Sequence, residues 1–179
     1  ELRLNPNQRC LGHVLTEAGY RTSYIGKWHL YADELGHHDE PRNSFVPRGP
    51  NRLGFDGEWK AFNFNHEYYK GGYYTETPEK RSYGEGVYDA DAQTDQAIDF
   101  LHRAASQADP FALILSWGPP HDPWIPENVP SRFLEMFRDK SFPNPPNYMP
   151  DNDVPYADAW ARLSEEERSY LEEWRRIYH

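Results

Sequence analysis

Apolar and polar residues follow two rhythms along this chain, one typical of helices and one typical of strands. Near the start, four apolar residues recur at helical spacing: Leu11, Val14, Leu15 and Ala18. This spacing predicts a helix over residues 9–18, and Gly19 is fit to end it. Alternating residues then predict a strand over residues 20–25. The chain therefore opens with a helix followed by a strand.

The next part of the chain has weaker patterns. Residues 26–58 are rich in Gly, Pro, Asn, Asp and His, and a connection of that length is predicted to be a functional loop. Residues 59–64 alternate well enough for a short strand. Residues 66–88, with Gly71-Gly72 and several tyrosines, predict a hairpin with exposed aromatic side chains.

The second half carries the clearest helical pattern, over residues 89–106. Its apolar stripe consists of Ala90, Thr94, Ala97, Ile98, Leu101 and Ala104. The unbroken apolar run 111–116 predicts a strand buried on both faces, as in a parallel sheet covered by helices. Two further helices are predicted, one over residues 131–138 and one opened by a capping box at Ser164. This order of helices and strands predicts an α/β fold.

Charge narrows the classes of partner. The 179 residues suit one domain or part of a larger one, and their net charge is −10. A chain this acidic is repelled by nucleic acid, so an anionic substrate must meet a local positive site. Aromatic residues make up 16% of the chain, which argues against disorder and favours packed, aromatic-rich loops of the kind associated with sugar binding.

The single cysteine and the two ends of the sequence give limited information on the compartment and the completeness of the chain. Cys10 has no second cysteine to pair with, so an intrachain disulfide is excluded and the redox compartment stays open. No apolar run approaches the roughly 20 residues of a membrane span. The chain has neither an initiator Met nor a signal peptide at its start. We therefore expect it to be an internal piece of a longer protein.

Lys27 and His29 are the first candidates for chemistry. They follow the strand over residues 20–25 with one residue between them. If extended geometry persists, their side chains share one face, roughly 6–7 Å apart, and Trp28 points the other way into packing. Ligands of open α/β sheets bind outside the carboxyl ends of the strands, so this pair predicts a receptor for a small tetrahedral anion. A solvated lysine beside a structural histidine is the other interpretation.

His121 is the second candidate. It follows the apolar strand 111–116, within Trp-Gly-Pro-Pro-His-Asp-Pro-Trp, and so also lies at a carboxyl strand end. Prolines on both sides limit its movement. The alternative is a histidine that only caps the turn. Asp122 either orients the imidazole or caps a turn itself.

Other polar groups are weaker candidates. The run His37-His38-Asp39-Glu40 resembles a metal cluster, but neighbours on an extended chain point in opposite directions, so a solvated loop is expected. Solvated surface is also expected for the remaining candidates of a substrate subsite: Arg48, Arg52 and the tyrosines between 68 and 88. His13 and His102 fall within predicted helices and are expected to be structural.

The stretch Gly-Tyr-Arg-Thr-Ser-Tyr-Ile-Gly-Lys-Trp-His-Leu, residues 19–30, resembles the second signature of the sulfatase family. The matching residues are Tyr20, Thr22, Gly26, Lys27, Trp28 and His29. The family resemblance continues at His121, where a buried strand ends in a Pro-His pair, and at the turn Gly54-Phe55-Asp56. It is densest over residues 11–30 and 111–126.

The resemblance implies roles for three of these residues. Lys27 and His121 bind the sulfate, His121 also assists departure of the alcohol, and His29 supports the nucleophile. Sulfatases use a formylglycine, made from a cysteine in a Cys-x-Pro-Ser-Arg type motif, together with calcium. Cys10 is followed by Leu-Gly-His and is not that cysteine. The nucleophile and the calcium ligands are expected outside this chain, which supplies no metal ligand.

The resemblance also implies a fold, an activity and partners. Residues 1–179 are expected to be the central part of a catalytic domain with the alkaline phosphatase-like α/β fold, a three-layer sandwich around a mostly parallel sheet. The expected substrate is a sulfate-ester small molecule or sulfated glycan, and the chain alone, without the rest of its domain, is expected to be inactive. A periplasmic, secreted or lysosome-like location follows from the family. A phosphatase, phosphodiesterase or phosphonate hydrolase of the same superfamily, or a non-catalytic anion- or glycan-binding fragment, remains the alternative.

Overall fold

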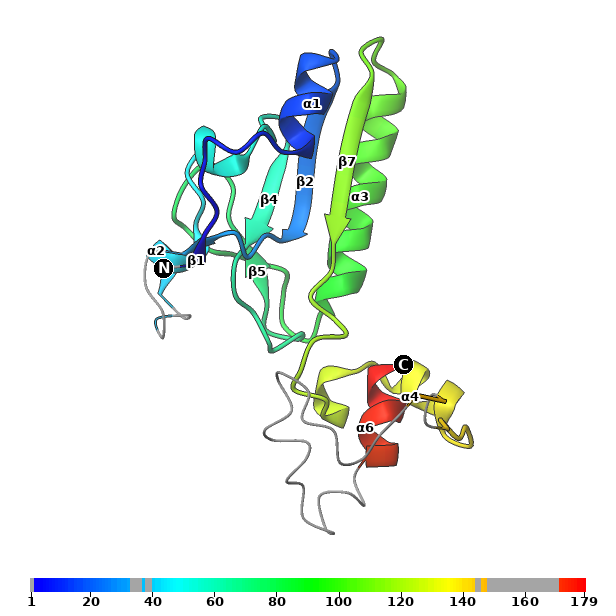
Figure 1. Ribbon diagram of the computed structural model, residues 1–179. Coiled ribbons are helices and arrows are strands. Elements are labelled where there is room, and N and C mark those ends of the chain that lie inside the picture. Colours follow the sequence, from blue (N-terminus) through cyan, green and yellow to red (C-terminus); the bar gives the residue numbers. More distant parts are fainter. Residues whose placement is uncertain (1, 33–36, 38–39, 144–145, 148–170) are drawn as a thin grey trace. The chain divides into compact units, whose positions relative to one another are not determined.

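The chain divides into two compact units, Glu1–Pro119 and Pro120–His179. A computed structural model describes residues 2–32, 37, 40–143, 146–147 and 171–179 (Figure 1). The expected capping box at Ser164 and most of the proline-rich stretch before it lie outside the described residues. Each unit is treated by itself below.

A parallel three-stranded sheet forms the centre of the first unit. Its order is β4-β2-β7, with β2 at Arg21–Lys27, β4 at Trp59–Phe62 and β7 at Phe111–Ser116. Both neighbours run parallel to β2, and Gly26 lies beside Ala61 on one side and Ser116 on the other. The carboxyl ends of all three strands therefore meet at one edge of the sheet, as predicted for ligand binding.

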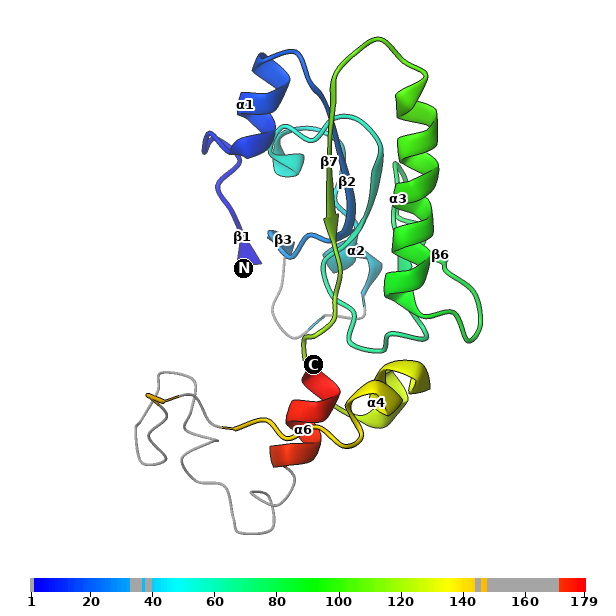
Figure 2. The ribbon, with the colours of Figure 1, turned by 90° about the vertical axis from the view of Figure 1, so that its right-hand side faces the viewer.

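Two helices cover the sheet, α1 at Leu11–Glu17 and α3 at Asp89–Ala105. Figure 2 shows the sheet nearly edge-on, with α1 on one side and α3 on the other. This three-layer α/β arrangement with a parallel sheet confirms the predicted fold class. Gly19, in the left-handed region with a φ of 85°, follows α1 as expected for a helix stop.

The predicted buried faces of the two helices were partly wrong. Gly12 is the buried residue of α1, whereas Leu11 and Val14 are 58% and 41% exposed. On α3 the residues that face inward are Asp89, Gln93, Ala97, Phe100 and Ala104. Ile98 and Leu101, counted in the predicted stripe, are exposed. The spacing of apolar residues predicts that a helix has an apolar face. Which face of the helix is buried depends on the elements that pack against it.

The strand β7 also departs from expectation. Its six residues are half-buried rather than buried on both faces. It is the outer strand of the described sheet, since β2 pairs with it along one edge and no described strand pairs with the other. The missing neighbour on that side explains the exposure of an otherwise unbroken apolar run.

The core of the first unit is aromatic and lies against β2 and β4. Its buried cluster consists of Tyr24, Trp28, Val46, Leu53, Phe55, Trp59 and Ala61. The ring centroids of Trp28 lie 4.9 Å from Tyr24 and 5.0 Å from Trp59, both in edge-to-face geometry. Such pairs add about 0.5–1.5 kcal/mol each beyond burial of their area, so this cluster fixes the backbone around Trp28.

Short elements fill the long connection after β2, which was predicted to be a loop. They are β3 (Tyr31–Ala32), α2 (Pro41–Ser44) and the 3-10 helix η1 (Pro50–Arg52). β3 pairs antiparallel with β1 (Leu2–Arg3). The described parts of the connection thus contain short regular elements.

The predicted hairpin is confirmed. β5 (Gly72–Tyr73) pairs antiparallel with β6 (Arg81–Ser82). The aromatic side chains around it are less exposed than predicted, because Tyr68, Tyr74 and Tyr88 are each at most 9% exposed. These tyrosines contribute to the core instead of to a solvated aromatic surface.

The described part of the second unit contains η2 (Pro126–Asn128), α4 (Ser131–Phe137) and α6 (Leu171–Tyr178). The prediction of a helix over residues 131–138 is confirmed. Helix α6 occupies the end of the segment expected to be helical after residue 164, and Ile177 on it is buried. Among the described helices, none is long and apolar enough to cross a membrane.

Candidate active site

Near its end, β2 contains a glycine that no other residue can replace without strain. Gly26 has a φ of 110°, a conformation that residues with a Cβ rarely adopt. A Cβ added there would lie 1.9 Å from the carbonyl oxygen of Ser116 on β7. The glycine therefore allows the neighbouring strand to approach closely where β2 ends.

Two hydrogen bonds hold the backbone after Gly26. The Tyr24 hydroxyl donates to the carbonyl oxygen of Lys27 at 2.7 Å, and the Trp28 N–H donates to the Phe62 carbonyl oxygen at 2.7 Å. The Trp28 side chain is 5% exposed within the aromatic cluster. The prediction that Trp28 points into packing is confirmed, and the half-buried Lys27 is held next to this anchor.

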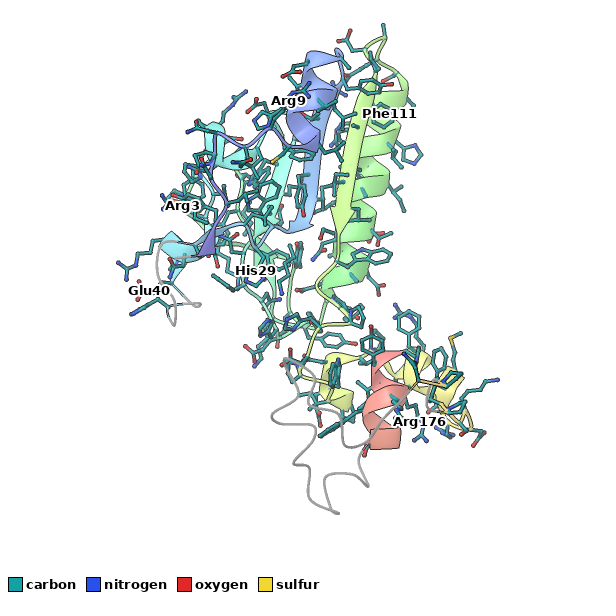
Figure 3. The ribbon with its side chains drawn as sticks, viewed as in Figure 1. Arg3, Arg9, His29, Glu40, Phe111 and Arg176 are labelled. Atoms are coloured by element: carbon teal, nitrogen blue, oxygen red, sulfur yellow. The ribbon has the colours of Figure 1, made fainter. Side chains whose placement is uncertain are left out.

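His29 does not continue the strand, so the same-face argument for Lys27 and His29 was wrong. β2 ends at Lys27, and His29 has a φ of 54°, in the left-handed region. A non-glycine residue held there costs on the order of 1–3 kcal/mol, and such residues cluster at functional sites. Figure 3 shows His29 beyond the ends of the parallel strands. Its exposed ring meets Phe64 edge-on, with centroids 4.9 Å apart.

His121 lies on an exposed loop of the second unit. Its Nδ1 is 2.7 Å from the Asp122 carboxylate oxygen Oδ1 and 3.1 Å from the Asp122 carbonyl oxygen. A carboxylate on one ring nitrogen fixes the tautomer and leaves the other nitrogen to face a substrate. Of the two roles predicted for Asp122, this contact favours orientation of the imidazole.

The structure places the candidate residues at two positions along the chain. Lys27 and His29 share one loop in the first unit, and His121 belongs to the second. Within the first unit, β7 ends beside β2 at the pair Gly26–Ser116, and His121 follows Ser116 by five positions. A common pocket for Lys27 and His121 remains a prediction.

A buried acidic residue near this edge was missed by the sequence analysis. Asp89, the first residue of α3, is 1% exposed, and burial raises the pKa of its carboxyl group to about 7. The Asn65 side-chain amide donates to its Oδ2 at 2.6 Å. A Cβ on Gly71 would lie 2.0 Å from the same oxygen. From the sequence, Asp89 resembled an ordinary acidic residue of a first helical turn.

Arg52 was predicted to be solvated surface and is instead fully buried. Its guanidinium donates to the carbonyl oxygens of Val46 and Thr75 and pairs with Glu76 at 2.9 Å. It also lies 4.7 Å from the ring centroid of Trp59. Arg52 thus ties two loops to the aromatic core and is structural.

The remaining histidine and cysteine candidates have local roles. The ring nitrogen Nδ1 of His13 accepts a hydrogen bond from the Cys10 N–H at 3.1 Å, so His13 is structural, as predicted. His37 contacts Glu40 at 2.7 Å, while His38 and Asp39 lie outside the described residues. Cys10 is the N-cap residue of α1 rather than part of the helix.

The described residues do not fit a calcium site or a formylglycine. No group of three or more His, Cys, Asp or Glu side chains able to hold a metal ion occurs in the part of the chain that the structure describes. Cys10 lacks the sequence that follows a formylglycine cysteine.

The first unit is a parallel α/β sheet with a lysine and a histidine at the carboxyl edge of its central strand. Comparison with known proteins identifies the family. The sulfatase family model matches residues 3–163. The chain belongs to the sulfatase family.

Similar proteins include two that are named as sulfatases. The ulvan-active sulfatase of Formosa agariphila is 32% identical over 151 residues, which cover 84% of this chain and 27% of that protein. The N-acetylglucosamine-6-O-sulfatase of Bacteroides thetaiotaomicron is 32% identical and is matched over 82% of this chain and 22% of its own length. The chain spans about a quarter of the length of these relatives.

Solved structures agree with the fold. The yidJ protein of Bacteroides fragilis is 28% identical with a TM-score of 0.70, and the match covers 98% of this chain and 37% of that one. A second structure, of a protein in complex with its substrate D-glucosamine-2-N,6-O-disulfate, is 28% identical with a TM-score of 0.53 over 81% of this chain and 25% of that one. The predicted membership of the sulfatase family and its α/β fold is confirmed.

Proposed function

We propose that residues 1–179 form the central part of a catalytic domain that hydrolyses sulfate esters. The observation that carries the proposal is the fixed loop at the end of β2. The burial of Trp28, the close approach of Ser116 that Gly26 allows and two hydrogen bonds to the backbone hold this segment at the edge of the sheet where ligands bind. Membership of the sulfatase family supplies the reaction class.

Each of the three side chains has a proposed task. The Lys27 ammonium binds sulfate oxygens as a point charge and stabilises the negative charge that develops on them. His121, oriented by Asp122 at 2.7 Å, binds the sulfate and donates a proton to the alcohol oxygen as the sulfur–oxygen bond breaks. His29 hydrogen-bonds the nucleophile, the role that the family resemblance implies.

Calcium and formylglycine are typical of the family. For this protein we propose that both are held by other parts of the catalytic domain, because the described residues do not fit them. The contribution of the present chain is to bind the sulfate group and to assist the leaving alcohol. By itself the chain is proposed to be inactive.

The proposed substrate is a sulfated carbohydrate. Two relatives are named for action on ulvan and on N-acetylglucosamine 6-sulfate esters, and one similar structure holds a sulfated glucosamine. The chain's net charge of −10 also requires that an anionic substrate be met by local cations, which Lys27 provides.

The test uses the protein encoded by the complete open reading frame that contains this chain. Its turnover of glucosamine 6-sulfate, 4-nitrophenyl sulfate and 4-nitrophenyl phosphate is measured side by side. Faster turnover of the sulfated sugar than of the phosphate ester is expected. Preferential turnover of the phosphate ester would support the phosphatase alternative, and turnover of the aryl sulfate alone would contradict the carbohydrate assignment.

A further inference from the structure

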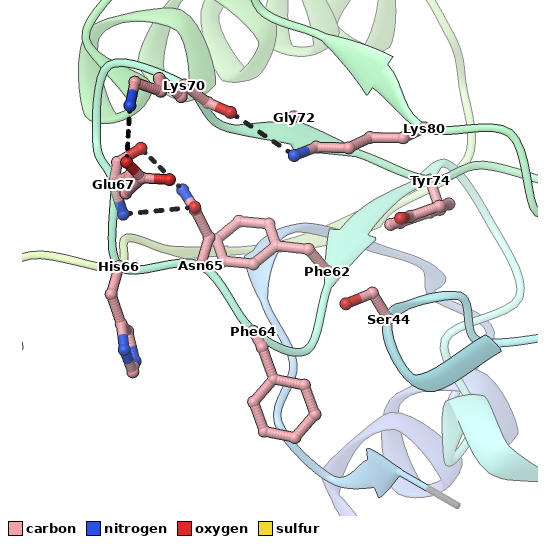
Figure 4. Close-up of a pocket in the computed structure, with 10 residues that line it drawn as sticks. All are labelled: Ser44, Phe62, Phe64, Asn65, His66, Glu67, Lys70, Gly72, Tyr74 and Lys80. Atoms are coloured by element: carbon pink, nitrogen blue, oxygen red, sulfur yellow. Dashed lines mark hydrogen bonds and ion pairs between the residues drawn. The ribbon is translucent and has the colours of Figure 1, made fainter. Parts of the chain in front are cut away.

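A pocket with a volume of about 360 Å³ opens beyond the end of β4. Ligand pockets run from roughly 300 to 1,000 Å³, so this one has room for about one sugar ring. It lies wholly within the first unit, and its lining comes from α2, from the segment after β4 and from the β5–β6 hairpin. Figure 4 shows these residues around the opening.

The pocket adjoins the predicted catalytic loop. Phe62, on its wall, is the register partner of Lys27, and its carbonyl oxygen accepts the Trp28 N–H at 2.7 Å. Phe64, also on the wall, contacts the ring of His29. A substrate whose sulfate lies at Lys27 and His29 therefore has its neighbouring atoms close to this pocket.

The surface of the pocket is mainly polar. Of its aromatic residues, Phe62 and Tyr74 are only 2% and 4% exposed and present little apolar area, whereas Phe64 is half-buried. The groups that face solvent are the side chains of Asn65, Glu67 and Lys70, together with Lys80. Such a surface suits a hydroxylated or charged sugar better than an apolar leaving group.

The two lysines of the pocket differ in their partners. Lys70 Nζ pairs with the Glu67 carboxylate at 2.7 Å, which neutralises it. The hydrogen bond from Lys80 Nζ goes to the Lys70 carbonyl oxygen at 3.4 Å, a long contact with an uncharged group. Figure 4 shows the Lys80 side chain extended along the pocket toward that oxygen. Lys80 also acts at longer range on the carboxyl groups of Glu67 and Asp89. In a chain of net charge −10, the lining nevertheless has two lysines, Lys70 and Lys80, for its one carboxylate, that of Glu67.

Resting on the proposed function, we propose that this pocket binds a second anionic group of the substrate, carried by a sugar, and that Lys80 is its main charge partner. The group is a sulfate or a carboxylate in addition to the ester that is cleaved. Lys80 then determines specificity: it selects doubly anionic saccharides over singly sulfated ones.

The experiment compares substrates that differ in their second anion, using the protein from the complete open reading frame. The substrates are glucosamine 6-sulfate, glucosamine 2-N,6-O-disulfate, a disaccharide of glucuronate and glucosamine 6-sulfate, and 4-nitrophenyl sulfate. Lys80→Ala is expected to raise KM about three- to tenfold for the doubly anionic sugars. It should leave kcat unchanged for every substrate and KM unchanged for the aryl sulfate. Comparison of KM for the disulfate with KM for the glucuronate-containing disaccharide shows whether the pocket prefers a sulfate or a carboxylate.

Two further variants control for structural effects. Lys80→Arg keeps the charge and is expected to retain most of the wild-type KM. The double variant Glu67→Gln/Lys70→Gln removes the ion pair of the same pocket without changing its net charge, so its effect on KM should be smaller than that of Lys80→Ala. If Lys80→Ala changes KM equally for all four substrates, or changes KM for none of them, the proposal is overturned.

Binding is also measured without turnover, by calorimetric titration with the disulfate and the monosulfate. If Lys80→Ala weakens binding of the disulfate but not of the monosulfate, the result supports the proposed pocket. This holds even if the protein hydrolyses no sulfate ester, a result that would refute the proposed function but not the pocket. Conversely, sulfatase activity with no dependence on Lys80 in either assay would leave the function standing and refute the pocket.

Discussion

The two histidine loops of this protein are built in different ways. The loop after β2 carries Lys27 and His29 and is fixed by residues distant in sequence, through the burial of Trp28 against Trp59 and the approach of Ser116 to Gly26. The loop after β7 carries an exposed His121 whose described contacts are with the neighbouring Asp122. The backbone before His29 is thus anchored by the core, whereas the His121 ring is in contact with the residue next to it in sequence.

This difference matters for how each loop responds to change. A side chain anchored by the core should lose its position when a remote packing residue is removed, and that loss should appear in stability as well as in rate. A side chain held locally should respond mainly to substitution of its own neighbours. Substitutions in the protein encoded by the complete open reading frame distinguish anchoring by the core from local support.

The largest effect is expected from the anchor of the first loop. Trp28→Ala removes a side chain that is 5% exposed and should reduce the free energy of unfolding by about 3–5 kcal/mol. Trp124→Ala is the matched change in the second unit, where the half-buried indole donates to the Pro120 carbonyl oxygen at 2.9 Å. Its cost should be about 1–2 kcal/mol. Chemical denaturation measures both, and equal costs would remove the contrast between the loops.

The next effect is on catalysis. Lys27→Ala should lower kcat/KM for a sulfate ester by about 10²–10³, as for loss of one donor to a developing oxyanion. His121→Ala should cause a loss of similar size. Lys140→Ala, which removes an exposed lysine of the second unit, serves as the control and should leave the rate unchanged. Turnover like that of the wild type by the Lys27 variant would exclude the proposed role.

A smaller effect is expected from the buried carboxyl group beneath the sheet edge. Burial raises the pKa of Asp89 from 3.8 to about 7, so the folded protein keeps a proton that the unfolded chain loses near pH 4. Stability should therefore fall as the pH rises from about 4 to about 7, and then level off.

Asp89→Asn removes this titration while keeping an acceptor for Asn65. At pH 8 the variant should be more stable than the wild type by on the order of 2 kcal/mol. Melting temperatures from pH 4 to pH 8 measure the effect, with Asp99→Asn on the exposed face of the same helix as the control. An unchanged pH profile in the Asp89 variant would show that the carboxyl group ionises as readily in the folded state as in the unfolded one.

The smallest effect is expected from the local support of the second loop. Asp122→Asn weakens the contact with the His121 ring and should lower kcat about two- to fivefold, since the pair is exposed and such pairs contribute little. The melting temperature should not change. A loss as large as that of His121→Ala would mean that Asp122 takes part in the chemistry directly.

The sequence predicted those features that depend on short stretches of chain. The strands at 20–25, 59–64 and 111–116, the long helix from Asp89 and the inward direction of Trp28 all follow from local periodicity, and the structure confirms them. The family was also evident locally, because its signature occupies twelve consecutive residues. Such features need no knowledge of what lies across the sheet.

Features set by distant contacts could not be predicted in the same way. Arg52 is buried because Trp59, Thr75 and Glu76 surround it, and none of them is near it in sequence. His29 turns into a left-handed conformation after β2, which a pattern of alternating residues does not reveal. Asp89 is enclosed against Gly71 and Asn65. For Arg52 and Asp89 the deciding partners are more than five positions away in the sequence.

The roles proposed for Lys27 and His121 require that both side chains contact the sulfate group of the substrate. A crystal structure of the complete protein with bound sulfate tests this requirement most directly. The account predicts one sulfate ion with oxygens about 2.7–3.2 Å from both Lys27 Nζ and a ring nitrogen of His121. A His121 imidazole on the opposite side of the sheet from the Lys27 ammonium would contradict it.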